Sequence, residues 1–134
     1  MNHQKTYYEC QIERIARARG IQSYQYIQVR QSKAFMDRYL SEKIELKKLA
    51  LSACMSRFHY IRVFRQVYGI TPRQYLRDLR IAKAKELLRA GLSPTQACFD
   101  VGYTSLPTFS NAFKQGTGHS PKAWQQSAIA IRNK

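Results

Sequence analysis

Long hydrophobic runs are absent from this sequence. No stretch approaches the roughly 20 apolar residues that a membrane-spanning helix needs, and the first residues, MNHQKTYYEC, lack the apolar core of a signal peptide. We therefore expect a soluble, cytoplasmic protein that does not insert into a membrane. The length of 134 residues suits one compact domain or a tight pair of subdomains.

Cysteine and histidine are also scarce. The three cysteines, Cys10, Cys54 and Cys98, form no CxxC pair, and their odd number argues against a disulfide framework and for a reducing compartment. The three histidines lie far from the cysteines along the chain, so no zinc-ligand spacing is present. We expect neither a metal ion nor another cofactor.

Acidic residues are the third shortage. The chain has 23 Lys and Arg against 8 Asp and Glu, which gives a formal net charge of +15. The positive charges are spread along the chain and are not confined to one tail. Such an excess of one sign repels itself unless a polyanion neutralises it, so nucleic acid or an anionic membrane is the expected partner.

An internal repeat is present. FRQVYGITPRQY at residues 64–75 recurs as FKQGTGHSPKAW at residues 113–124, at an offset of 49 residues (113 minus 64). Phe, Gln, Gly and Pro are identical, and the basic, hydroxyl and aromatic positions match in kind. A duplicated segment in so short a chain predicts two similar structural units.

The chain around the first copy of the repeat has the pattern of a helix-turn-helix unit, which we call the first repeat from here on. We expect it over about residues 44–68, with a turn near Cys54 and a second helix capped by Ser56. Two helices joined by a short turn, with a basic amphipathic second helix, are typical of DNA-binding units. Cys54 and Cys98 are interpreted as small residues that let paired helices approach.

The second repeat follows the same plan over about residues 94–116. Pro94 is expected to start its first helix, Gly102 to make the turn, and Thr104 or Ser105 to cap the second helix. Between the repeats, the pattern from Pro72 to Ala90 predicts one long linker helix that begins after a Thr cap and ends at a Gly.

Three segments precede the repeats. Thr6–Arg19 predicts an amphipathic helix, which we expect to pack on the body through its apolar face. Gln22–Arg30 has an unclear pattern, compatible with a short strand or with extended chain. Phe35–Ile44 predicts another helix. We therefore divide the chain into a helical extension (1–34), the domain with both repeats (35–126) and a basic tail (127–134).

The segments YGITPRQYLRDLRIAKAKELL and VGYTSLPTFSNAFKQGTGHSPKAW resemble the DNA-binding domain of the AraC/XylS family of bacterial transcription regulators. The resemblance covers about residues 35–126. It implies an all-α fold in which two helix-turn-helix subdomains are joined by a linker helix. It also implies recognition helices in successive major grooves of double-stranded DNA. We expect RNA polymerase as a partner, and no enzymatic activity because the sequence shows no convergent reactive groups. With 34 residues before the matched region, the chain resembles the short, stand-alone members. Because two units in one chain can contact two half-sites without dimerising, we expect a monomer.

The candidate DNA-contacting residues of the first repeat are those that face away from the core. Tyr60, Phe64 and Val67 are expected to face inward. Among the outward residues, the basic ones not assigned to bases are expected to contact phosphates. The candidates are Ser56, Arg57, Phe58, His59, Ile61, Arg62 and Arg65, with Arg57, His59 and Arg65 as the phosphate contacts.

Three of these residues are expected to contact bases. Arg62 falls where the resemblance implies a base-contacting arginine, whose planar fork suits the O6 and N7 atoms of guanine. Phe58 and Ile61 are large apolar groups on a face that should be wet, and contact with thymine methyl groups would explain them. The alternative is that Phe58 and Ile61 pad against the N-terminal segment.

The second repeat offers a weaker set of contacts. At Asn111 the resemblance implies an arginine, and near Leu106 and Pro107 it implies polar residues, so this chain departs from the pattern. Asn111 would pair with adenine, Leu106 would contact a thymine methyl, and Lys114 would bind phosphate. The candidates are Ser105, Leu106, Pro107, Ser110, Asn111 and Lys114.

Other residues have structural interpretations. Arg80 is expected to be half-buried and paired with an acid from Asp78, Glu86 or Asp100. Tyr75 and Trp124 occupy equivalent repeat positions and are interpreted as core aromatics, with stacking on nucleic acid as the alternative. The functional alternatives are a non-specific or architectural nucleic-acid binder, a module that lies on an anionic membrane, and an enzyme.

Overall fold

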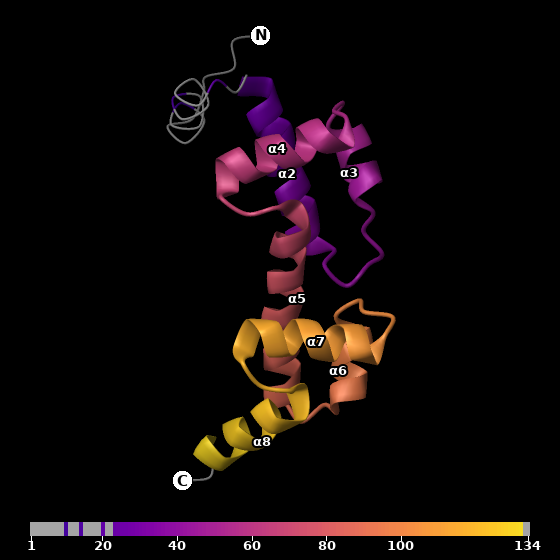
Figure 1. Cartoon of the computed structure of the whole chain (residues 1–134), viewed down its shortest axis with the longest axis vertical. Helices are drawn as coiled ribbons and strands as arrows, with labels where there is room; N and C mark the ends of the chain where they lie inside the picture. The colour runs from indigo at the N-terminus through magenta and orange to yellow at the C-terminus, as the bar shows by residue number, and fades with distance from the viewer. Residues whose placement is uncertain (1–9, 11–13, 15–19, 21–22, 133–134) are drawn as a thin grey trace. The chain divides into compact units, whose positions relative to one another are not determined.

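The computed structural model describes Cys10, Arg14, Gly20 and residues 23–132. Within residues 23–132 the chain forms seven helices and no strand (Figure 1), so the predicted all-α fold is confirmed. None of the described helices is both long and apolar enough to cross a membrane. The helices are α2 (Ser23–Arg38), α3 (Leu46–Ser52), α4 (Arg57–Tyr68), α5 (Pro72–Arg89), α6 (Pro94–Asp100), α7 (Leu106–Thr117) and α8 (Pro121–Arg132).

The chain forms two compact units. The first contains α2, α3, α4 and the start of α5 up to Gln74, and the second contains residues 39–43 and the chain from Tyr75 onward. The helices run through two of the boundaries expected from the sequence: α2 continues past residue 35, and α8 past residue 126. The helix expected over Thr6–Arg19 lies outside the described residues, apart from Cys10 and Arg14.

The N-terminal helix of the first unit corrects two expectations. The segment Gln22–Arg30, compatible with a strand in the sequence, is helical from Ser23 onward. Its alternating polar and apolar letters resembled a strand, but Tyr26, Val29 and Met36 are buried at helical spacing. The helix ends at Arg38, six residues before Ile44, where the helix expected from Phe35 was to end.

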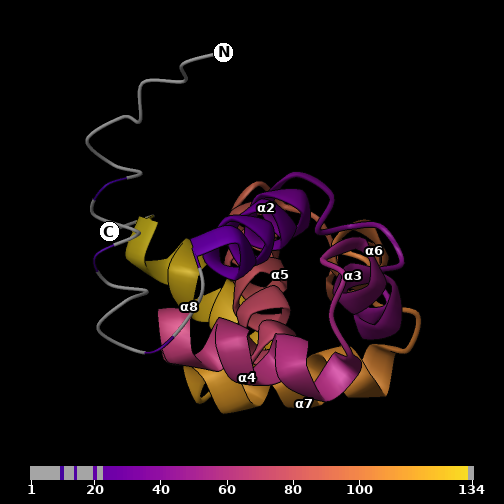
Figure 2. The same cartoon turned by 90° about the horizontal axis from the view of Figure 1, so that it is seen from above.

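In the first unit, α2 and α3 both pack against α4 (Figure 2). The Tyr60 hydroxyl, on the buried face of α4, donates to Ser32 Oγ on α2 at 2.7 Å. Ser32 in turn donates to the Val29 carbonyl at 2.6 Å, so both buried hydroxyls are satisfied. Burial raises the pKa of Tyr60 to about 12, against the lowering effect of the Ser32 hydrogen bond.

The core of the second unit surrounds α5. Leu88 of α5 and Phe109 and Phe113 of α7 are fully buried. The other fully buried residues of this core lie on α5, on α6 and at the C-cap of α6: Ala84, Ala97, Cys98 and Val101. Trp124 of α8 packs its ring edge-on against Phe113, with 5.7 Å between ring centroids, and the Arg89 guanidinium lies over Trp124 at 5.1 Å. The interpretation of Trp124 as a core aromatic is consistent with this packing.

Arg80 was expected to pair with an acid, but its partners are main-chain carbonyl groups. Its Nε donates to the carbonyl oxygen of Leu40 at 2.8 Å, and a terminal nitrogen donates to that of Glu42 at 2.9 Å. The guanidinium also lies over the ring of Tyr103, and burial lowers its pKa. Because residues 39–43 are not in a helix, their carbonyl groups need partners, and the arginine supplies two donors.

Each helix-turn-helix turn contains one residue with positive φ. In the first unit it is Cys54 (φ 56°), and in the second it is Gly102 (φ 99°). Cys54 is exposed, so its interpretation as a packing residue is wrong, whereas Cys98 is fully buried as expected. The residue equivalent to Cys98 is Ala50, because each accepts the same turn hydrogen bond, from Met55 and from Tyr103.

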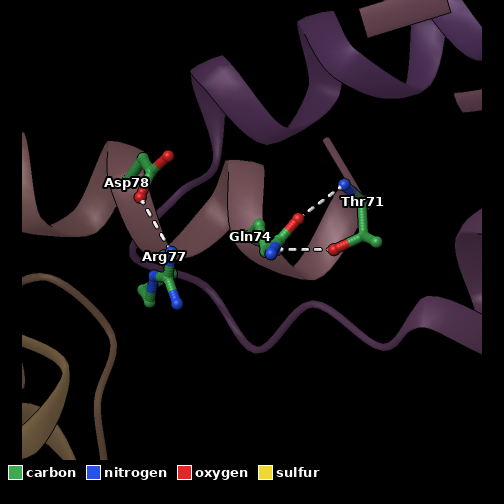
Figure 3. Close-up of polar contacts among 4 residues, drawn as sticks. All are labelled: Thr71, Gln74, Arg77 and Asp78. Carbon is green, nitrogen blue, oxygen red and sulfur yellow. Dashed lines mark hydrogen bonds and ion pairs between the residues drawn. The ribbon is translucent and has the colours of Figure 1, made fainter. Parts of the chain in front are cut away.

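The first turn of α5 is closed by a reciprocal cap (Figure 3). The Gln74 amide donates to Thr71 Oγ1 at 3.2 Å, and the Thr71 amide donates to Gln74 Oε1 at 3.0 Å. Both bonds satisfy amide groups that lack helical partners, and Pro72 has no N–H to satisfy. The Thr71 cap predicted from the sequence is therefore confirmed. One turn later, Arg77 contacts the Asp78 carboxylate at 3.5 Å.

We predict that Gly102→Ala destabilises the second unit more than Gly91→Ala does. Both glycines have a φ near +100°, so either substitution strains the backbone. A Cβ at Gly102 would also lie 2.8 Å from the Ser41 carbonyl oxygen, whereas nothing lies within 4 Å of a Cβ at Gly91. Urea unfolding should show an additional loss of about 1–3 kcal/mol for Gly102→Ala. Equal losses would contradict the close approach.

Candidate nucleic-acid interface

The second helix of the first unit, α4, has a fixed orientation. Its N-cap is Ser56, as predicted, whose hydroxyl accepts from the His59 amide at 3.2 Å. Its inner face is buried through Tyr60, Val63 and Phe64. Val67, which was expected to face inward, is half-buried, and Val63 takes that place in the core. The inward face defines which residues of α4 face solvent.

Four candidates of α4, Arg57 among them, are exposed to solvent. Phe58 is 78% exposed, and the side chains of Arg62 and Arg65 are exposed as well. The guanidinium of Arg57 lies 5.7 Å from the centroid of the Phe58 ring. A large aromatic ring at this exposure has little packing role, so it is available for a ligand.

Ile61 is placed differently from Phe58. It is half-buried and lines a surface hollow of about 300 Å³ together with Leu46, Arg57, Pro72 and Arg73. The lining of this hollow, next to the start of α5, therefore combines apolar side chains with two arginines. The sequence grouped Ile61 with Phe58 on one outer face, but the hollow gives Ile61 a more recessed position.

His59 is held by two neighbours. Its Nε2 atom lies 2.7 Å from the side-chain amide of Gln25 on α2, and its Nδ1 atom lies 2.8 Å from a terminal nitrogen of Arg62. Sequence reasoning did not identify Gln25, because it left the segment Gln22–Arg30 without a helix. The spacing of three residues between Tyr26 and Val29, which puts both on one face of a helix, was the signal that could have placed Gln25 on a helix.

The equivalent helix of the second unit, α7, repeats this arrangement. Ser105, one of the two predicted caps, is its N-cap and accepts from the Thr108 amide at 3.4 Å. Phe109 and Phe113 are buried, at the positions of Tyr60 and Phe64 in α4. The outward candidates are Leu106, Pro107, Asn111 and Lys114, which are exposed, and Ser110, which is half-buried.

The charge of these helices favours a polyanion. α4 contains three arginines and α7 one lysine, and neither contains an acidic residue. A phosphate approaching either helix therefore meets no carboxylate on it. Among the residues that the structure describes, no three His, Cys, Asp or Glu side chains are grouped as metal ligands would be.

A family model described as a helix-turn-helix domain matches residues 49–127. The chain is 33% identical over 94 residues to the MmsAB operon regulatory protein of Pseudomonas aeruginosa, covering 69% of this chain and 31% of that protein. The structure resembles the DNA-binding domain of AdpA in complex with a target DNA (TM-score 0.74, 28% identity, covering 79% of this chain and 96% of that one). It also resembles a transcriptional regulator of the AraC-type DNA-binding domain proteins from Chromobacterium violaceum (TM-score 0.66, 24% identity, covering 75% and 91%).

The chain spans 26%, 31% and 37% of the length of three curated relatives that it matches, so the match is to one domain of each. That domain holds both helix-turn-helix units, and the family model covers more than half of this chain. The chain belongs to the AraC/XylS family of helix-turn-helix proteins, and the matched residues are its DNA-binding domain.

Proposed function

We propose that this chain is a sequence-specific transcription regulator that binds double-stranded DNA with two recognition helices, α4 and α7. Each helix enters a major groove with its outward face toward the bases. The groove is wide enough for a helix and offers a different set of donors and acceptors for each base pair. The relatives named above are transcription regulators or their DNA-binding domains, which supports this assignment and gives no support for an enzyme.

One observation carries the proposal. Phe58 and Arg62 stand exposed on the solvent face of α4, while Tyr60 and Phe64 anchor the other face in the core. Exposure of the apolar Phe58 ring to water is unfavourable, and the neighbouring arginine lies on a helix without acidic residues. This arrangement is explained if a thymine methyl group covers the ring and a guanine accepts from the arginine.

Four further candidates, two basic residues and two serines, bind the sugar–phosphate backbone in this proposal. Arg65 and Lys114 lie in the last turns of α4 and α7 and neutralise phosphates. Ser56 and Ser105 accept the cap hydrogen bonds, which leaves each hydroxyl hydrogen to donate to a phosphate oxygen. Such contacts set the position of each helix without specifying sequence.

The partners and state follow from this assignment. Because two DNA-binding units lie in one chain, one copy can contact two half-sites, so we propose that it binds as a monomer. RNA polymerase is the proposed protein partner, and the cytoplasm, where the DNA of a bacterium lies, is the proposed location.

Selection from a random DNA library, followed by gel-shift titration, tests the proposal. A specific regulator should bind its selected duplex at least about a thousandfold more tightly than a random duplex. An architectural protein, held mainly by charge, would bind both alike and lose affinity steeply with salt.

We predict that Arg62→Ala and Arg65→Ala have different effects. Arg62→Ala should cost about 1–3 kcal/mol on the selected duplex and relax the preference at one base pair. Arg65→Ala, and Lys114→Ala in the second unit, should weaken binding on all duplexes and reduce the salt slope by about 1. Titrations at several salt concentrations measure both. If Arg62→Ala weakens binding equally on every sequence, it contacts no base.

We predict that Phe58→Ala reduces DNA affinity without reducing stability. The side chain is 78% exposed, so its removal should change the free energy of unfolding by less than about 0.5 kcal/mol. It should also reduce the preference for thymine at one position. Phe64→Ala, on the buried face, is the matched control and should cost about 3–5 kcal/mol of stability. A large loss of stability in Phe58→Ala would indicate a packing role.

We predict that the half-site under α4 is the more exacting one. α4 offers the guanidinium of Arg62, whereas α7 offers Asn111 and Ser110 and begins with Leu106 and Pro107. Substituting each base pair in turn should give roughly tenfold to hundredfold penalties under α4 and clearly smaller ones under α7. Larger penalties under α7 would reverse this assignment.

A further inference from the structure

Three side chains form a hydrogen-bonded chain from α2 to the solvent face of α4. Gln25 lies 2.7 Å from Nε2 of His59, in a half-buried contact between the two helices. His59 Nδ1 lies 2.8 Å from a terminal nitrogen of Arg62, which is three residues further along α4. Both nitrogens of the imidazole are thus engaged within the protein, which leaves no ring nitrogen for a phosphate.

The chemistry of the three groups determines the direction of these hydrogen bonds. A guanidinium can only donate, so Nδ1 of His59 accepts from Arg62. A neutral imidazole has one acceptor and one donor, so Nε2 carries the hydrogen and donates to Gln25. The structure places the side-chain nitrogen of Gln25 next to Nε2. Because two donors that face each other form no hydrogen bond, we assign the amide with its oxygen at that position, where it accepts from Nε2.

We propose that His59 is a positioning residue that holds the Arg62 guanidinium for base contact, and that Gln25 sets the tautomer and ring orientation of His59. A free arginine loses rotamer entropy when it binds a base, and one that is held beforehand loses less. The contact to Nδ1 uses one N–H, so enough donors remain on Arg62 for the O6 and N7 atoms of guanine. This replaces the phosphate role that the sequence suggested for His59.

The second unit lacks this arrangement. At the offset of 49 residues, His59 corresponds to Thr108 and Arg62 corresponds to Asn111, and neither has an imidazole or a guanidinium. The Thr108 amide is held by the Ser105 cap. A device that positions an arginine is therefore specific to α4, in line with the greater base selectivity proposed for that helix.

Two isosteric variants of the full chain test the inference, which rests on the proposed function. His59→Asn places a carbonyl oxygen near the position of Nδ1, so it keeps an acceptor for Arg62. His59→Gln places its amide near the position of Nε2, so it keeps the contact to Gln25 and loses the one to Arg62. Both are measured on the selected duplex and on duplexes substituted at the base pair that Arg62 contacts.

We expect His59→Asn to keep the preference at that base pair within about twofold, and His59→Gln to lose about tenfold of it. Affinity for random DNA and the salt slope should not change in either variant. In the Arg62→Ala background, His59→Gln should have no further effect on the preference, because the effect acts through Arg62. Gln25→Met, which cannot accept from Nε2, should lower the same preference with α4 otherwise unchanged.

The outcomes separate the inference from the proposed function. If the wild-type chain binds selected and random duplexes alike, the proposed function is wrong and the inference with it. If the wild type is selective but His59→Gln keeps its preference, the inference alone is wrong. A uniform loss of affinity with a reduced salt slope in His59→Gln would show that His59 contacts phosphate, which also overturns it. Thermal unfolding of each variant verifies that it is folded.

Discussion

The structure depends on one repeated packing interaction, a pair of buried aromatic rings at the spacing i, i+4. In α4 the pair is Tyr60 and Phe64, with ring centroids 6.0 Å apart, and in α7 it is Phe109 and Phe113, 5.8 Å apart. All four side chains are fully buried. Burial of each ring contributes about 1.5–3 kcal/mol, so a rotation of either helix that exposed its pair would be strongly unfavourable. Because the inner face of each helix is fixed, so is its outer face.

The two outer faces then differ although the two inner faces agree. Duplication retained the caps, Ser56 and Ser105, and ended each helix with a glycine at positive φ, Gly69 and Gly118. The solvent-facing positions diverged, and the guanidinium of Arg62 is replaced by the amide of Asn111. Residues that hold a helix in place are constrained by the core, while residues that face the ligand are constrained by the ligand. An uneven pair of binding helices is the consequence.

The turns of the two helix-turn-helix units both contain a residue with positive φ, but the residue and its surroundings differ. In the first turn an exposed cysteine adopts the positive φ, and in the second Gly102 does so, where an added Cβ would lie 2.8 Å from the Ser41 carbonyl oxygen. Arg80 binds the neighbouring carbonyl groups of Leu40 and Glu42. The segment of residues 39–43 is thereby attached to the second unit through its main chain. Main-chain carbonyl groups outside helices need donors, and here a half-buried arginine provides them.

Features that depend on local or repeated patterns could be predicted from the amino-acid sequence alone. These include the all-α class, the two helix-turn-helix repeats, the caps at Ser56 and Thr71, and the outward position of Phe58 and Arg62. Helix caps act within four residues, and amphipathic spacing reports which face is buried, so neither needs long-range information. The tertiary structure was needed to show that Tyr60 bonds to Ser32, that Arg80 binds carbonyl groups, and that Gln25 reaches His59. In each case the deciding partner lies 28 to 40 residues away along the chain, and a contact between distant residues is formed by packing, which no local pattern encodes.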